Sequence, residues 1–185
     1  WRKIFKESWP LVLTSIFIFI YHRMDQVILL RMKGAEAVGS YSVAVKLAEI
    51  FNIIPVALKV SILPLMSEYF KTSKTHLEKT YNLSFKYLLL FIIPLAIWVT
   101  NFSEPIISFF YGAKFLSSSK VLSILIWAEI FVFMGVINNA ILIATNKQIL
   151  DPLFTGVSAV INIVLNFLLI PKYSFIGAAI ATFFS

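Results

Sequence analysis

The chain opens with an apolar run that is long enough to cross a lipid bilayer. Residues 9–30 read WPLVLTSIFIFIYHRMDQVILL, and the first thirteen of them carry no charge. As an α-helix this run is about 33 Å long at about 1.5 Å per residue, which matches the hydrocarbon core of a bilayer. Four polar residues, His22, Arg23, Asp25 and Gln26, interrupt its C-terminal half. A charge facing lipid near the middle of a helix costs at least about 2.5–3.5 kcal/mol, so these side chains are expected to face protein or a water-filled cavity.

More apolar runs follow, and the composition agrees with a membrane protein. Hydrophobic residues make up 59% of the chain and charged residues only 14%, against about 25% charged residues in soluble domains. The sequence therefore predicts an all-α fold, a polytopic integral membrane helix bundle with about five complete transmembrane helices and the start of a sixth. The expected spans are residues 9–30, 38–66, 83–101, 121–145, 149–170 and 175–185, the last cut short, with an interfacial segment at 103–116.

The formal net charge of +7 is explained by membrane topology rather than by nucleic-acid binding, since most basic residues lie in the connections between spans. Eight of them lie on the N-terminal side of the membrane and five on the other side. The positive-inside rule then predicts a cytoplasmic N-terminus for this piece. The chain has no cysteine, which excludes disulfides and thiolate metal sites. We expect no cofactor and no metal.

Six charged residues lie deep inside the predicted spans, away from the interfaces, and together they form a neutral set. Charges at this depth usually pair with one another or line a wet cavity, and they mark functional sites. The three bases are Arg23, Lys46 and Lys59, and the three acids are Asp25, Glu49 and Glu129.

Helical spacing indicates which of these groups can meet. Arg23 and Asp25 are about 200° apart on a helical wheel, so a regular helix cannot turn both toward the centre of one cavity. Lys46 and Glu49 are three residues apart and can pair, either to fix two helices or as part of a site. Asn52 shares the polar face of the second span with Glu49 and with Lys59, which lies ten residues beyond Glu49.

Two further polar features allow more than one interpretation. Asn162 and Asn166 form a stripe on the fifth span with Thr155 and Ser158, and hydrogen bonding between helices is favoured for them over contacts with a sugar ligand. Glu129, two residues after a tryptophan, can instead lie near the membrane–water interface, where a charged carboxylate costs little free energy.

At this point the chain resembles a known family through a series of short motifs in a fixed order. It is similar to the bacterial polysaccharide and O-antigen repeat-unit flippases of the multidrug/oligosaccharidyl-lipid/polysaccharide exporter superfamily. The resemblance covers nearly the whole chain. The motifs are WPL at 9–11, DQVILL at 25–30, VGSYSVAVKLAE at 38–49, IPVAL at 54–58, LP at 63–64, FFYGAKF at 109–115 and IPKYSFIGAAIAT at 170–182.

The resemblance implies a transporter of two helix bundles around a central cavity, of which this chain would be most of the second. It implies that undecaprenyl-pyrophosphate-linked oligosaccharides are flipped across the bacterial inner (cytoplasmic) membrane by alternating access, for O-antigen or capsule synthesis. The implied partners are the lipid-linked oligosaccharide, membrane lipids, the missing N-terminal bundle and a glycan polymerase, with no nucleic acid.

On this basis the embedded residues receive roles. Arg23, with Lys46 and Lys59, is the candidate for the lipid diphosphate, because the forked donors of arginine match phosphate oxygens. Asp25, Glu49 and Glu129 are candidates for ion coupling or charge pairing. Asn52, Asn162 and Asn166 are candidates for polar helix–helix or sugar contacts.

Two other functions are weighed against this one. A cation-coupled multidrug exporter of the same superfamily would carry organic cations, and three embedded bases argue against it. A membrane-embedded enzyme of polysaccharide biosynthesis would need a large polar loop, whereas the longest loops here are short and hold no nucleophile, metal-ligand or phosphate-loop motif. The sequence therefore predicts a transporter and not an enzyme.

Overall fold

The computed structural model describes the backbone of residues 2–185 and the side chains of residues 9, 12, 13, 15–19 and 23–185. Over the described residues the regular structure is entirely helical. Its elements are α1 (Arg2–Lys33), α2 (Ala35–Glu49), the 3₁₀ turn η1 (Ile50–Asn52), α3 (Ile53–Thr72), α4 (Lys74–Asn101), α5 (Ser103–Tyr111), η2 (Ala113–Phe115), α6 (Ser118–Ala144), η3 (Gln148–Leu150) and α7 (Asp151–Phe184).

Four helical segments of the described part are long and apolar enough to cross a membrane: Ala35–Thr72, Lys74–Asn101, Ser118–Ala144 and Gln148–Phe184. Helix α1 adds 32 residues, although many side chains of its N-terminal half lie outside the description. The predicted all-α, polytopic membrane fold is confirmed.

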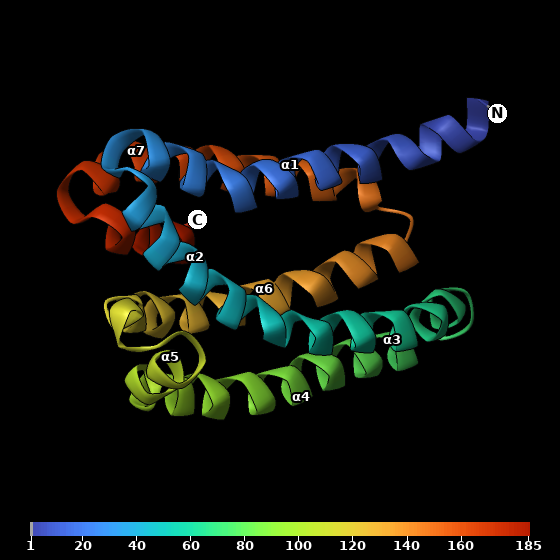
Figure 1. Cartoon of the computed structure of the whole chain (residues 1–185). Coiled ribbons are helices and arrows are strands. Elements are labelled where there is room, and N and C mark those ends of the chain that lie inside the picture. The colour runs from blue at the N-terminus through green and yellow to red at the C-terminus, as the bar shows by residue number, and fades with distance from the viewer. Residues whose placement is uncertain (1) are drawn as a thin grey trace.

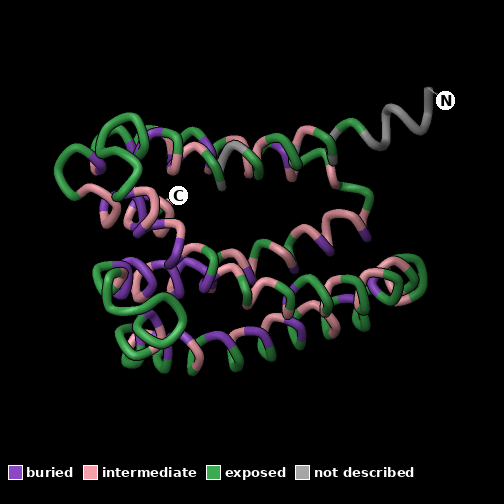
Figure 2. The backbone as a smooth tube through the Cα atoms, viewed as in Figure 1, coloured by how far each residue is buried: buried purple, intermediate pink, exposed green. Residues whose placement is uncertain are grey.

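The helices form two layers that are joined at one end (Figure 1). Helices α1 and α7 pack along each other, while α6 packs against both α3 and α4 in the second layer. Helix α2 contacts α1, α6 and α7, and so connects the layers. Figure 2 shows that buried residues are concentrated where α2, α6 and the end of α7 meet. The main hydrophobic core lies there, and its residues Tyr41, Leu122 and Ile126 are almost fully buried.

The second helical segment bends close to its first proline. Helices α2 and α3 run on from Ala35 to Thr72 through the 3₁₀ turn Ile50–Asn52. Pro55 has no N–H to donate to the carbonyl of Phe51, four residues earlier, so the regular helical ladder is broken at this point. The bend follows directly after Glu49, so it determines the direction of the Glu49 carboxylate relative to the other layer.

Helix α7 is two limbs joined by a sharp break. Ser174 has φ 53° and ψ −134°, and Pro171 removes a backbone donor just before it. The limb 151–173 packs along α1, and the limb 175–184 turns back toward α2 (Figure 1). The Lys33 ammonium donates a 2.9 Å hydrogen bond to the carbonyl of Pro171, and a cation at this position satisfies the carbonyl end of the first limb.

The return of the second limb depends on Gly177. A Cβ built on this residue would lie 2.5 Å from the carbonyl oxygen of Leu169, a backbone atom that cannot move aside on its own. Gly177→Ala is expected to destabilise the fold by about 1–3 kcal/mol, the usual cost of overpacking, and to lower the melting temperature of the purified protein. Gly39→Ala is the matched control, because its added Cβ meets nothing within 4 Å. Equal melting temperatures for the two variants would contradict the close packing of the limbs.

Helix α5 is the segment expected to lie along the membrane surface. It has nine residues, buries Ser103 and Ile107, and ends at Gly112, whose φ of 82° suits glycine. Phe109 and Phe110 are 83% and 63% exposed. An interfacial position of α5 remains a prediction.

Candidate functional site

A small cavity, lined mostly by apolar surface but holding several polar side chains, lies where the two layers join. Its walls come from α1, α2, α6 and the second limb of α7, and it contains all three acids that the sequence places inside the membrane. The lining residues are Asp25, Tyr41, Val45, Ala48, Glu49, Leu125, Ala128, Glu129, Val132 and Thr182.

One side of the cavity is a hydrogen-bonded group around Asp25, which is only 4% exposed. The backbone N–H of Gln26 donates to one carboxylate oxygen at 2.6 Å, and the Tyr41 hydroxyl donates to the other. The Tyr41 oxygen also lies 3.3 Å from the hydroxyl oxygen of Thr182. The Tyr41 hydroxyl therefore connects α1 with the second limb of α7, and a buried carboxylate with two donors is well accommodated.

On the other side of the cavity, buried polar atoms lack hydrogen-bond partners among the described residues. Glu129 is 7% exposed, and its Oε2 is buried with no hydrogen-bond partner among the described residues. Asn52 lies beside Glu129. Its side-chain oxygen Oδ1 is also buried and has no hydrogen-bond partner among the described residues. A buried acceptor without a donor costs about 1–3 kcal/mol, so these two oxygens can accept a hydrogen bond from a bound water, proton or ion.

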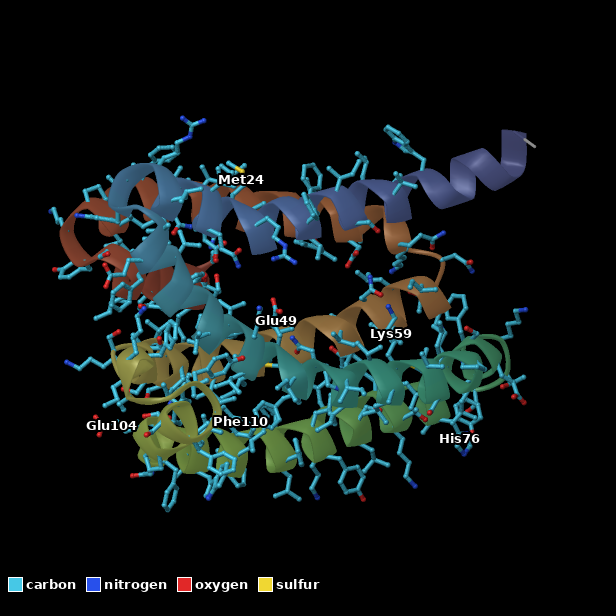
Figure 3. All side chains as sticks on the ribbon, in the orientation of Figure 1. Met24, Glu49, Lys59, His76, Glu104 and Phe110 are labelled. Atoms are coloured by element: carbon cyan, nitrogen blue, oxygen red, sulfur yellow. The ribbon has the colours of Figure 1, made fainter. Side chains whose placement is uncertain are left out.

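Glu49 lies on the same wall, one helical turn before Asn52. It is half-buried and lines the cavity with Asp25 and Glu129. Figure 3 shows Glu49 on the side of α2 that faces the α1–α7 layer. Within the described part of the chain no group of three acidic or histidine side chains is close enough to hold a metal ion, so the cavity gathers the acids without forming a ready metal site.

The three embedded bases lie outside this cavity. Arg23 is exposed and Asp25 buried, in keeping with their separation of about 200° on a regular helix. Lys46 is also exposed, whereas Glu49, three residues on, is turned inward. The structure therefore brings the acids together and leaves two of the bases, Arg23 and Lys46, exposed.

Lys59 has a separate polar environment. Its ammonium group is half-buried and donates to the side-chain oxygen of Asn139 on α6, and the carboxylate of Asp151 is close enough to attract it. The neighbouring Asn138 accepts a 2.7 Å hydrogen bond from the hydroxyl of Tyr81 on α4. The two asparagines thus connect α6 to both α3 and α4.

Asn162 and Asn166 are both fully buried and lie away from the cavity. The amide of Asn166 donates to the side-chain and backbone oxygens of Asn162, at 2.8 and 3.0 Å. The amide of Asn162 donates in turn to the hydroxyl of Ser185, at 3.2 Å. These bonds connect the two limbs of α7.

Sequence reasoning missed the two other polar residues of the cavity, Tyr41 and Thr182. Tyr41 lies four residues before Val45 and eight before Glu49, so its helical spacing already placed it on the polar face of the second span. Thr182 had no such signal, because it meets Tyr41 only through the return of the α7 limb. The side chain of His22 lies outside the described residues.

A helical membrane protein with carboxylates gathered in a buried cavity between helices has the features of a transporter. The model of the MatE family matches residues 10–168, which is most of the chain, so the chain belongs to the MatE family. No solved structure matches the chain.

Several curated proteins are similar over almost the full chain. It is 30% identical over 182 residues to the probable low-salt glycan biosynthesis flippase Agl15 of Haloferax volcanii, covering 98% of this chain and 39% of that protein. It is 26% identical to the lipid II flippase MurJ of Bacillus subtilis, covering 97% of this chain and 36% of MurJ. It is 25% identical to the putative O-antigen transporter of Shigella flexneri, covering 97% and 43% of the two chains.

These findings confirm the predicted family, and they confirm a transporter family rather than an enzyme. The chain is a multi-pass membrane protein of the flippase superfamily. It spans between 36% and 46% of the length of the relatives it matches.

Proposed function

We propose that this chain is one helix bundle of a transporter that flips undecaprenyl-pyrophosphate-linked oligosaccharide repeat units across the cytoplasmic membrane. The transport would proceed by alternating access and would serve the synthesis of O-antigen or capsule. Membership of the MatE family and the similarity to proteins named as glycan and lipid II flippases support this proposal.

The observation that carries the proposal is the separation of the embedded charges. Asp25, Glu49 and Glu129 line one cavity, whereas Arg23 and Lys46 are exposed on α1 and α2. Exposed bases at membrane depth are costly against lipid, so a water-filled passage that carries an anion is a suitable environment for them. The exposed bases therefore suit the binding of an anionic substrate, and the acids of the cavity suit the binding of a coupling ion.

The exposed bases would bind the diphosphate of the lipid carrier. Arg23 offers five N–H donors in a fixed fork and can bind two phosphate oxygens at once. Lys46 adds a compact positive charge. Lys59 donates a hydrogen bond to Asn139 and would reach the substrate only after breaking it. We therefore assign Lys59 a smaller contribution to diphosphate binding.

The acid cavity would couple transport to an ion gradient. The unpartnered oxygens of Glu129 and Asn52 and the carboxylate of Glu49 provide acceptors for a proton or a cation. Asp25 would sense its arrival through Tyr41, which contacts both α1 and the second limb of α7. Uptake of a positive charge would thereby change how tightly α1, α2, α6 and α7 hold together.

The remaining parts of the proposal concern partners and location. A second bundle of the same transporter would complete the passage, with Asn, Ser and aromatic side chains meeting the sugars. Membrane lipids would surround the apolar outer faces, and a glycan polymerase would use the flipped product. The N-terminus of this piece would lie on the cytoplasmic side.

A multidrug exporter is the second candidate, and the acid cavity is the observation that favours it. Organic cations seek carboxylates in a site that is shielded from water. The exposed Arg23 and Lys46, however, would repel such a substrate at the entrance of the passage. We therefore rank this function second.

The test is deletion of the gene in its own host. A flippase mutant is expected to lose surface polysaccharide and to accumulate the lipid-linked repeat unit on the cytoplasmic leaflet, with unchanged sensitivity to cationic dyes. Re-introduction of the gene should restore the surface polysaccharide. Normal polysaccharide together with increased dye sensitivity would contradict the flippase and support the exporter.

A further inference from the structure

Helix α4 has an outer face that the described helices leave exposed. The helix contacts α3, α5 and α6, and Figure 1 shows it at the edge of the second layer, on the side away from α1 and α7. Up to Pro94 its buried residues are Leu77, Ser84, Leu88 and Ile92. The residues about 165° around the helix from these, at about 100° per residue, are all exposed. This surface, which we call the α4 outer line, consists of Lys79, Asn82, Lys86, Leu90 and Ile93.

The α4 outer line changes from polar to apolar along its length. Lys79 and Lys86 are two helical turns apart, about 10 Å at about 1.5 Å per residue, and Asn82 lies between them. The line continues with Leu90 and Ile93, which are 66% and 40% exposed. A phospholipid has the same order, with a charged headgroup at one end and apolar tails below it. The line therefore matches one lipid molecule that lies along the helix.

Lys86 lies deeper along α4 than a lysine at the membrane surface. Helix α4 ends at Asn101, so Lys86 is about 22 Å from that end at about 1.5 Å per residue, whereas the hydrocarbon core of a bilayer is about 30 Å thick. With Asn101 at the opposite interface, where α5 begins, the backbone of Lys86 would lie about 8 Å inside the hydrocarbon. A short apolar surface of this kind is accommodated when the bilayer thins locally and lysine side chains extend toward the headgroups.

The two lysines of the line are available to an anion from outside the chain. Neither Lys79 nor Lys86 has a hydrogen bond or an ion pair within the described part of the chain. Residues 74–101 contain a single acid, Glu78, and it lies about 100° around the helix from Lys79. An external phosphate would therefore supply the counter-charge that α4 does not present on this line.

Two further observations indicate that lipid headgroups reach this level. Tyr87, next to Lys86, is 61% exposed, and exposed tyrosines are enriched where the headgroups meet the hydrocarbon. The line also belongs to the side of the membrane that carries more of the basic residues and that we expect to be cytoplasmic. Clusters of basic residues on that side attract anionic lipids.

We propose that the α4 outer line binds an anionic phospholipid, with the phosphate between Lys79 and Lys86 and the tails over Leu90 and Ile93. Asn82 would donate its amide N–H to a phosphate or ester oxygen. Helix α4 supplies none of the residues that line the acid cavity, so this lipid would be a partner of the bundle and not its cargo. The site is independent of the molecule that the transporter carries.

Native mass spectrometry of the purified full-length transporter tests this site. The protein is mixed either with phosphatidylglycerol, which is anionic, or with phosphatidylcholine, which is zwitterionic, and the bound lipids are counted. Lys79→Gln/Lys86→Gln is expected to lower the affinity for phosphatidylglycerol by about 30-fold, because each lysine near an anionic lipid contributes a factor of about five. Binding of phosphatidylcholine should not change. Lys79→Arg/Lys86→Arg should retain phosphatidylglycerol, since both charges are kept.

The matched control is Lys71→Gln/Lys74→Gln. It removes two exposed lysines at the turn between α3 and α4, away from the α4 outer line, and it should retain phosphatidylglycerol. Equal losses in the two double variants would reduce the effect to a general attraction by positive charge and overturn the site. Retention of phosphatidylglycerol by Lys79→Gln/Lys86→Gln would overturn it too, as would its displacement by inorganic phosphate or by an equal concentration of undecaprenyl pyrophosphate.

Discussion

Replacement of Arg23 by alanine in the full transporter is expected to abolish complementation of a flippase-deficient strain while the protein still inserts in the membrane. Arg23 is exposed at membrane depth on α1, and two charge-assisted hydrogen bonds to a diphosphate are each worth about 1.5–3 kcal/mol. Their loss corresponds to a fall in transport of at least about 100-fold, since every 1.4 kcal/mol is tenfold. The amount of surface polysaccharide is the measurement, normalised to protein level.

Two further variants sharpen this prediction. Arg31→Ala removes an exposed arginine of the same helix beyond the predicted span, and it should complement normally. Arg23→Lys keeps the charge but loses the forked geometry, so an intermediate level is expected. Full complementation by Arg23→Ala would exclude its role in binding the diphosphate.

The second large effect is expected from Asp25→Asn. Asparagine has nearly the same shape. Its carbonyl oxygen can still accept the hydrogen bond of Tyr41, while the N–H of Gln26 loses its side-chain acceptor, so the fold should be retained with a loss of about 1–3 kcal/mol of stability. Asparagine carries no negative charge with which to sense the arrival of the ion, however, and transport driven by an ion gradient should fall to the level of passive exchange. The measurement is flipping by proteoliposomes with and without an imposed proton or sodium gradient.

The control for Asp25 is Glu36→Gln, which removes an exposed carboxylate in the first turn of α2 and should leave gradient dependence unchanged. Glu129→Gln should resemble Asp25→Asn, because both carboxylates line the same cavity. Retention of gradient dependence by both cavity variants would sink the assignment of this cavity to ion coupling.

The sequence predicts much of the local structure because membrane helices are governed by length and polarity. The apolar runs place the helices, and the proline at 171 falls three residues before the break at Ser174. The sequence also predicts that Arg23 and Asp25 point in different directions, since this follows from the angle between the two residues on one helix. Family membership could be inferred from short motifs that recur in a fixed order.

The cavity itself could not be predicted, because it depends on contacts between distant segments. Helical spacing shows that Glu49 and Asn52 share a face, but it does not show that Glu129 of α6 meets them. Tyr41 and Thr182 come together only because α7 folds back at Ser174. The buried position of Glu129 likewise depends on packing between helices.

The central claim is that an anionic lipid headgroup passes exposed bases while a separate acid cavity handles the coupling ion. The most direct measurement is flipping of a fluorescent undecaprenyl-pyrophosphate oligosaccharide by the purified full transporter in proteoliposomes, followed by its accessibility to a membrane-impermeant quencher. We expect gradient-stimulated flipping that excess undecaprenyl pyrophosphate inhibits and that an organic cation such as ethidium does not inhibit. Transport of ethidium by the same vesicles, with no movement of the lipid-linked oligosaccharide, would contradict it.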